Sequence, residues 1–328
     1  GDLPFLRVET YGSPILSTWM NRDLAIAGRL VIADAKNEVK EKLVYLKNAP
    51  VLIPALAIHL DRKANENPKP IDKQTHLCPL LGLKKKNGNP KDYFSQLLQC
   101  ETTLLGFDLY LVPIESPCIL GAEGEMLASY RLDNLVSAHA ALLGILSEKK
   151  PEIPIIQMAA FWNHEEIGSL TDEGASSPFF SDVLKRITLA YKMGEEDFIR
   201  LKTSSRFISI DVAHGYHPGY KDKYDSENSP KLGGGIGIKY DANQRYATNA
   251  RTSAEMIQLC IKHKIPYQTY ASHSNISSGT TIGPLASSEA GIPTVDIGIP
   301  ELPMHAAREL IATEDYFSLC KLLQTIYK

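Results

Sequence analysis

Two adjacent glutamates, Glu165 and Glu166, follow an apolar run and a histidine in the sequence FWNHEEIGS (residues 161–169). Neighbouring carboxylates repel each other, and each one resists leaving water. A bound cation would offset both effects. In a hydrolytic metal site, one glutamate of such a pair can bind the metal while the other accepts a proton from a bound water. This pair is the first candidate for chemistry in the chain.

Three further ligand-type side chains stand at the ends or starts of predicted elements. Asp211 ends the stretch RFISI, His305 follows TVDIGIPELPM, and Asp133 begins the stretch LDNLVSAHAALLGIL. Open α/β sheets bind ligands at the carboxyl ends of their strands, so we expect these side chains to share one edge. Carboxylate oxygens and imidazole nitrogens suit zinc, manganese or cobalt. The helical HExxH motif is excluded, because Gly168 stands four residues after His164.

Each of these residues also has a purely structural interpretation. Asp133 could cap the helix that follows it, since aspartate is a favoured N-cap residue. Asp211 could end a strand by bonding to the next turn, and His305 could be a loop histidine with satisfied hydrogen bonds. We interpret His214 and His217, in DVAHGYHPGY, as turn residues. The glutamate pair is harder to explain in this way, because a solvated pair does not require an apolar strand before it.

Strands and helices alternate in the hydrophobic pattern from about residue 120 onward. The pattern predicts strands over residues 153–162, 206–214 and 293–300, and helices over residues 132–146, 177–192, 252–264 and 314–328. Such alternation is typical of an α/β sandwich with helices on both faces of a central mixed sheet. This is the fold class that we expect for the larger part of the chain.

The bulk properties exclude several classes of protein. The chain has 328 residues, of which 44% are hydrophobic, and no run resembles a transmembrane segment or a secretory signal. A net charge of -3 argues against a nucleic-acid-binding surface. The five cysteines lie far apart and form no CxxC motif, which favours a reducing, cytoplasmic compartment over a disulfide framework. We therefore expect neither nucleic acid nor membrane as a partner.

Several longer motifs resemble those of the M18 metalloaminopeptidases, the aspartyl aminopeptidase family. They occur in the family's order and cover nearly the whole chain: TWMNRDLAIAGRL, LAIHLDRKANENPKPIDKQTHLCPLLG, LDNLVSAHAALLGIL, FWNHEEIGS, SIDVAHGYHPGY, GIKYDANQRYAT, SSGTTIGPLAS and DIGIPELPMHAARE. The resemblance implies a cytoplasmic aminopeptidase that hydrolyses the N-terminal residue of peptides with a water bound by two metals. It implies two zinc ions per subunit, with manganese or cobalt as other possible metals.

The resemblance also implies a role for each candidate residue. Asp133 matches the carboxylate that bridges the two metals, and Glu165 matches the general base. Glu166 and His305 match ligands of one metal, and Asp211 matches a ligand of the other. The family's remaining ligand is a histidine in an HTDxP motif, and its position would precede Gly1. His59 is not a convincing substitute for that histidine.

Domain organisation and assembly follow from the same resemblance. It implies a catalytic domain formed by residues 1–8 and 115–328, interrupted by an α+β dimerisation domain over residues 9–114. Dimers of such chains assemble into a dodecamer. In some members a histidine of the TW segment reaches the active site of a neighbouring subunit, and Ser17 stands at that position here.

One further residue is a candidate for setting substrate preference. Lys239, in GGGIGIKYDANQRYAT, lies in a motif associated with the family's substrate pocket, where it would pair with an acidic N-terminal residue. The alternative is an exposed lysine on a strand. Two other functions remain open at this point: a related zinc hydrolase, either a deacylase or a carboxypeptidase, or a catalytically inactive assembly or cargo protein.

Overall fold

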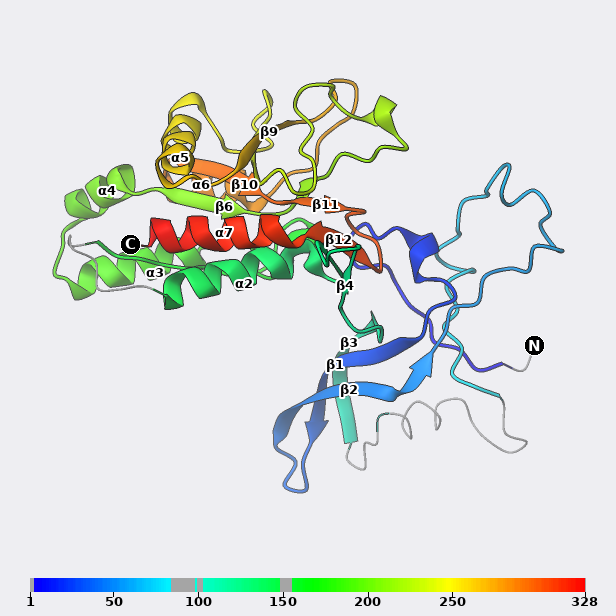
Figure 1. Ribbon diagram of the computed structural model, residues 1–328. Helices are drawn as coiled ribbons and strands as arrows, with labels where there is room; N and C mark the ends of the chain where they lie inside the picture. The colour runs from blue at the N-terminus through cyan, green and yellow to red at the C-terminus, as the bar shows by residue number, and fades with distance from the viewer. Residues whose placement is uncertain (1–2, 84–97, 99–102, 148–154, 328) are drawn as a thin grey trace. The chain divides into compact units, whose positions relative to one another are not determined.

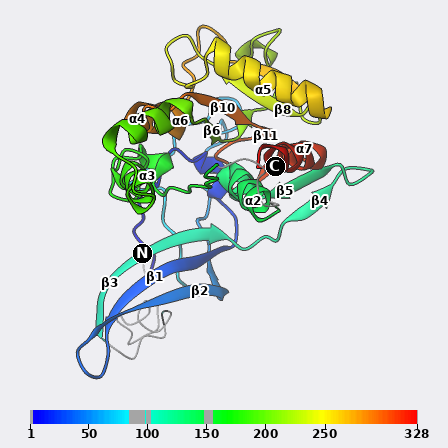
Figure 2. The same ribbon diagram turned by 90° about the vertical axis from the view of Figure 1, so that its left-hand side faces the viewer.

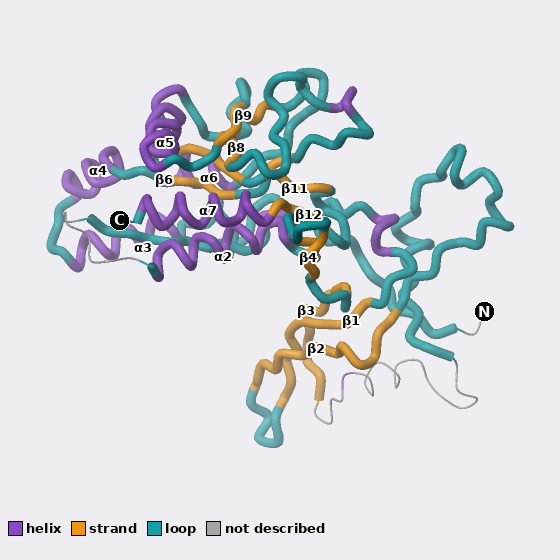
Figure 3. Tube along the Cα trace, in the orientation of Figure 1, coloured by secondary structure: helices purple, strands orange, loops and turns teal. Residues whose placement is uncertain are grey.

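The computed structural model describes residues 3–83, 98, 103–147 and 155–327. The chain divides into two compact units, Gly1–Ser116 and Pro117–Lys328. Long loops and three strands form the described part of the first unit, while helices and strands alternate in the second (Figure 3).

A three-stranded antiparallel sheet forms the framework of the first unit. Its order is β2–β1–β3, with β1 over Leu24–Ala33, β2 over Val39–Val51 and β3 over Thr103–Pro113 (Figure 1). A short 3-10 helix, η1, spans Leu16–Trp19. The core of this unit contains Leu24, Ile26, Val51, Ile53 and Leu77, which are all at most 6% exposed. Burial of such side chains contributes about 1.5–3 kcal/mol each, so this cluster holds the sheet to the loops that cross it.

The N-terminal segment packs within the first unit. Phe5 forms an antiparallel bridge with Leu80, and Leu81 N donates a hydrogen bond to Pro4 O over 2.9 Å. Residues 1–8 were expected to belong with the catalytic domain, whereas their described part joins the unit that contains residues 9–114. The division after Ser116 lies close to the expected boundary at residue 115. The catalytic and dimerisation roles of these parts stay predictions.

Two mixed sheets form the second unit. The four-stranded sheet has the order β6–β10–β8–β9, and the five-stranded sheet has the order β4–β5–β12–β11–β7. Their strands are β4 (Cys118–Leu120), β5 (Met126–Ser129), β6 (Phe207–Ile210), β7 (Ala213–His214), β8 (Ile236–Tyr240), β9 (Tyr267–Ala271), β10 (Thr294–Gly298), β11 (Pro300–Leu302) and β12 (Glu309–Ala312). Parallel pairs occur between β6 and β10, β8 and β9, and β7 and β11, while the remaining pairs are antiparallel. The expected mixed α/β class is confirmed.

Six α-helices of the described chain cover these sheets. They are α2 (Leu132–Leu146), α3 (Phe179–Ala190), α4 (Glu195–Ser204), α5 (Ala250–His263), α6 (Ile282–Ala290) and α7 (Thr313–Ile326), with short 3-10 helices η2 (Glu165–Ile167) and η3 (Lys221–Lys223). Helices α2 and α7 lie side by side, as Figures 1 and 2 both show. Their apolar faces meet the strands in one core that includes Ala140, Ile238, Ile297 and Leu319, each at most 1% exposed.

Two predicted strands differ from the structure. Residues 155–162 form no strand, and residues 153–154 lie outside the described chain. Side chains hold this segment instead: Trp162 packs against Phe180, and Tyr327 donates its hydroxyl to Met158 O over 2.9 Å. The prediction of a buried strand was therefore wrong: the described part of the segment pairs with no strand, and its apolar side chains are partly buried or exposed.

The predicted strand over residues 206–214 is interrupted at Asp211 and Val212, which separate β6 from β7. Asp211 N still donates to Ile297 O over 3.0 Å, and Ala213 N donates to Ile299 O over 2.8 Å. Backbone pairing thus continues across the interruption, where the two sheets meet. Asp211 lies at this junction.

The junction allows no side chain at Gly298. A Cβ added there would collide with the backbone carbonyl of Asp211, so we expect Gly298→Ala to lower the free energy of unfolding by about 1–3 kcal/mol or more. Gly279→Ala is the matched control, since Gly279 is exposed and has no atom within 4 Å of its added Cβ. Its effect should stay within about 0.5 kcal/mol. Denaturant titration followed by circular dichroism measures both, and equal stabilities of the two variants would contradict this account.

Candidate metal centre

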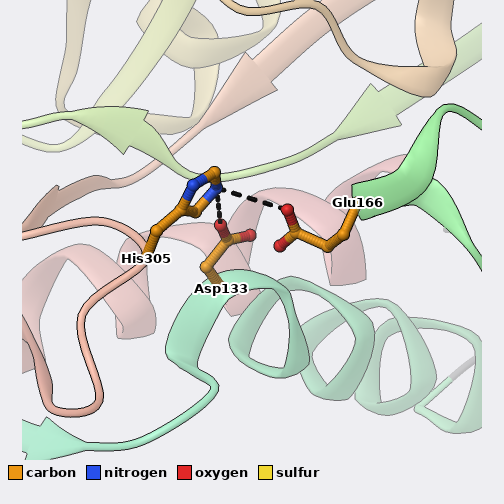
Figure 4. Close-up of side chains that lie close together, drawn as sticks. All are labelled: Asp133, Glu166 and His305. Carbon is orange, nitrogen blue, oxygen red and sulfur yellow. Dashed lines mark ion pairs between the residues drawn. The ribbon is translucent and has the colours of Figure 1, made fainter. Parts of the chain in front are cut away.

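Three ligand-type side chains converge in the second unit from three separate segments. Asp133 comes from the start of α2, Glu166 from η2 and His305 from the loop between β11 and β12. His305 Nε2 lies 3.3 Å from Asp133 Oδ2 and 3.3 Å from Glu166 Oε2 (Figure 4). The three potential ligand atoms all lie within 4.8 Å of one another. Two carboxylates and an imidazole at this spacing can hold one metal ion.

Unusual backbone geometry at the start of α2 aims Asp133 at this point. Arg131, before the helix, has a left-handed conformation with φ 59°, and Asp133 itself has a non-helical ψ of 108°. The peptide bond between Asp133 and Asn134 is cis. Asn134 Nδ2 donates to Ile210 O over 2.8 Å, which ties the helix start to the end of β6. Asp133 is thus held against the sheet edge and does not act as a side-chain N-cap.

A tight 3-10 turn places the two glutamates. His164 and Gly168, on either side of η2, both have left-handed conformations, with φ 59° and φ 101°. Ser169 N donates to His164 O over 2.9 Å, and the His164 ring bonds to Thr171 Oγ1 over 2.8 Å. These bonds close the loop on itself, so the carboxylates of Glu165 and Glu166 are presented from one short turn.

The electrostatic conflict expected for adjacent glutamates is present. Burial, followed by the charges of Glu166 and Asp133, raises the pKa of Glu165 to about 7. Burial and the charge of Asp133 likewise raise the pKa of Glu166, while His305 opposes the shift. The ionised form of each carboxylate is therefore less stable at this site than it would be in water. A cation between the two carboxylates would stabilise their ionised forms.

Asp211 lies outside the group of three but interacts electrostatically with its carboxylates. Burial is the main cause that raises the pKa of Asp211 to about 8, and Asp133 and both glutamates add to the effect. Lys239 acts in the opposite direction, with its Nζ 3.7 Å from Asp211 Oδ2. The Asp211 side chain keeps 22% of its surface exposed.

Lys239 has a position that sequence analysis only partly anticipated. It lies on β8, as expected, but its side chain is only 2% exposed, so the alternative of an exposed lysine is wrong. Its Nζ donates to Val212 O over 2.8 Å and lies 5.3 Å from the centroid of the Tyr246 ring. The ammonium group is thus a buried positive charge beside Asp211.

Two buried glutamates next to the site were missed by sequence analysis. Glu309 Oε2 accepts a hydrogen bond from Asp133 N over 3.2 Å, and its Oε1 accepts one from His305 N over 3.0 Å. Glu301 is 1% exposed, and burial, with the charge of Glu309 second, raises its pKa to about 11. Glu309 stands four residues after His305 in the motif MHAARE, which is a spacing that could have drawn attention to it.

The two histidines of DVAHGYHPGY are separated by the fold. His214 belongs to β7, where it pairs with Glu301 of β11, so its interpretation as a turn residue was wrong. His217 lies in the following loop, and its ring accepts a hydrogen bond from Gly219 N over 3.1 Å. The turn interpretation therefore holds for His217 alone.

A family model described as aminopeptidase I zinc metalloprotease (M18) matches residues 2–327 of this chain. The chain belongs to the M18 family. A probable M18 family aminopeptidase 2 from Streptomyces avermitilis is 39% identical over 326 residues, covering 97% of this chain and 74% of the relative. The predicted family membership is confirmed. It supports the prediction that the chain is a metal-dependent aminopeptidase of the zinc metalloprotease class.

Several solved structures share this fold. A chain of the cryo-EM structure of the Ape4 and Nbr1 complex is similar, with a TM-score of 0.90, 31% identity, and coverage of 100% of this chain and 67% of that one. A structure of the mApe1 dodecamer of S. cerevisiae has a TM-score of 0.79 and 25% identity, covering 99% of this M18 chain and 73% of that one. No helix in the described part of the chain has the length and apolar composition that a membrane span requires.

Loss of one ligand should release the metal from this M18 protein. We expect His305→Ala to weaken zinc binding by more than the roughly 10–100-fold that loss of an outer-shell group causes. His59→Ala is the control, because His59 is an exposed histidine of the first unit and should not affect zinc content. Elemental analysis after gel filtration measures both variants. Full zinc content in His305→Ala would remove His305 from the ligand set.

Proposed function

We propose that this chain removes the N-terminal residue of peptides with Glu165 as the general base and two zinc ions at the site. The observation that carries the proposal is the convergence of Asp133, Glu166 and His305 within 4.8 Å, with Glu165 next to Glu166 on the same turn. In this arrangement Asp133, Glu166 and His305 hold one zinc ion. Asp133 and Asp211 contribute to the second.

The donor set fits this role. Two carboxylates and one imidazole leave a coordination position open, as in catalytic zinc sites. When bound, zinc lowers the pKa of a coordinated water and polarises the scissile carbonyl. Glu165 would accept the proton of a water held at the site and deliver it to the leaving amine. The ligand carboxylates also offer acceptors for the free α-amino group that an exopeptidase must recognise.

The division of labour between the adjacent glutamates can be tested directly. Glu165→Gln should lower kcat by about 10²–10⁴-fold and leave zinc content nearly unchanged, because a base is not a ligand. Glu166→Gln should instead lower zinc content. Kinetics on a dipeptide substrate, together with elemental analysis, measure both effects. The opposite pattern, with zinc lost from Glu165→Gln and kept in Glu166→Gln, would invert the assignment.

The same assays separate the other functions. An aminopeptidase requires a free amino terminus, so an N-acetylated peptide should resist cleavage, whereas a deacylase would accept an acylated substrate. A catalytically inactive assembly or cargo protein would purify with less than one metal per chain.

We also propose a preference for an acidic N-terminal residue, with Lys239 as the positive charge. A substrate carboxylate is costly to bury without a cation. Lys239 is a buried cation beside Asp211 and uses one donor on Val212 O, so its ammonium retains further donors. Asp211 competes for the same charge, and a substrate carboxylate would have to share it.

Substitution of the lysine tests this preference. Lys239→Leu should lower kcat/KM for aspartyl and glutamyl peptides. The loss of transition-state stabilisation should be about 2–5 kcal/mol, as for a charged pair from which one partner is removed. Leucyl peptides should be spared. Assays with aspartyl, glutamyl, leucyl and lysyl peptides decide between the two roles of Lys239. Equal losses on all four substrates would make Lys239 a structural residue that serves Asp211, and a wild-type preference for leucyl or lysyl ends would exclude acidic specificity.

Assembly and location form the last part of the proposal. We propose that residues 9–114 mediate dimer formation and that dimers build a dodecamer, which is the assembly of the S. cerevisiae mApe1 relative. Sedimentation velocity of the native protein tests this. A cytoplasmic location is supported by the four described cysteines, which are all free thiols (Cys78, Cys118, Cys260 and Cys320).

A further inference from the structure

We propose that Glu309 is a positioning residue that fixes the backbones of two metal-ligand residues, Asp133 and His305, and thereby sets the affinity of the site for metal. This inference rests on the metal site proposed above and assigns a role to a residue outside the ligand set. The two hydrogen bonds from Asp133 N and His305 N, 3.2 and 3.0 Å long, end on the two oxygens of one carboxylate.

The carboxylate is presented by a rigid element. Glu309 is the first residue of β12 and lies opposite Ser129 of β5 in the antiparallel register. β11 lies along the other side of β12. The Glu309 residue is only 4% exposed, so strand pairing and burial both restrict its side chain. A ligand backbone bonded to it is held in place relative to the sheet.

Both bonded residues need such support. His305 has a left-handed backbone with φ 66°, which costs of order 1–3 kcal/mol for a residue other than glycine unless its surroundings hold it. Asp133 has a non-helical conformation inside the first turn of α2. Glu309 lies 176 residues from Asp133 and four residues from His305 along the chain. One side chain therefore joins a distant ligand segment to a local one.

A carboxylate is the group that this geometry requires. It accepts hydrogen bonds at both oxygens, whereas a glutamine amide offers one acceptor and replaces the other with a donor. The E309Q substitution would therefore leave either Asp133 N or His305 N without an acceptor. Aspartate keeps the charge and both oxygens, but its carboxylate is one methylene shorter and cannot reach both amides from the same strand position.

Zinc affinity of apo protein, measured by competition with a chromophoric chelator, tests the role of Glu309. We expect E309Q and E309D each to weaken zinc binding by about 10–100-fold, as for loss of an outer-shell partner. The d–d absorption spectrum of the cobalt-loaded variants should also change, because the ligand geometry shifts. E301Q is the matched control. Glu301 takes no part in the two hydrogen bonds to the ligand backbones, and the amide of glutamine can still donate to Glu309, with which the Glu301 side chain is hydrogen-bonded. The E301Q variant should bind zinc as tightly as wild type.

Each contrary outcome has a distinct meaning. Wild-type affinity in E309Q would overturn the proposal. Wild-type affinity in E309D with weak binding in E309Q would overturn the proposal too. The negative charge of the carboxylate, and not the position of its two oxygens, would then set the zinc affinity. Equal losses in E301Q and E309Q would overturn it as well, since they would attribute the effect to general disturbance of the buried pair. Absence of zinc binding by wild type would overturn the metal site itself.

Hydrogen exchange of the wild-type apo protein provides a test that does not depend on folding of a variant. The amides of Asp133 and His305 should exchange slowly, since both are donors to a buried carboxylate. Rapid exchange at both amides would overturn the proposal, whether or not the variants fold.

Discussion

Repulsion among carboxylates is the constraint on which the second unit depends. Burial raises the pKa values of Glu165, Glu166 and Asp211. The charge of Asp133 adds to each of these shifts. The Lys239 ammonium, 3.7 Å from Asp211 Oδ2, opposes this repulsion, and the His305 ring lies 3.3 Å from both Asp133 Oδ2 and Glu166 Oε2. The remaining conflict creates a demand for a cation at the point where the ligand atoms meet. Stability is therefore given up locally so that the protein gains affinity for a metal.

The backbone around the site is irregular at the positions that bring the charged side chains together. The interruption between β6 and β7 leaves Asp211 where the two sheets meet, and Gly298 gives it room there. Left-handed residues occur at or within two positions of three of the acidic or ligand-type residues: Arg131, His164 and His305. Such conformations concentrate at functional sites, where surrounding contacts hold them. The sheets and helices make the site rigid, and the irregular backbone at the sheet edge orients the acidic and ligand-type side chains toward it.

Much of this arrangement could be predicted from sequence. The 3.6-residue periodicity predicted the helix over residues 132–146 with the bounds observed for α2, and the polar residues at element ends indicated Asp133, Glu166 and His305, which the structure brings together. The apolar run over residues 153–162 was misread, because composition does not say whether another strand is available to pair with it. Glu309 was missed for a related reason: hydrogen bonds to backbone amides 176 residues away leave no local pattern in the sequence.

The wide spacing of the ligands along the chain has a consequence for folding. Asp133, Glu166 and His305 belong to α2, η2 and the β11–β12 loop, which become neighbours only when the second unit has closed around its core. An unfolded chain cannot present the three together, since the entropy of closing such long loops opposes it. A metal held by these three residues would bind the native state in preference to the denatured ensemble and would shift the folding equilibrium toward the native state by mass action. The ion that would serve hydrolysis would thus also stabilise the native state once the second unit has folded. Chelation would lower the melting temperature as well as the activity.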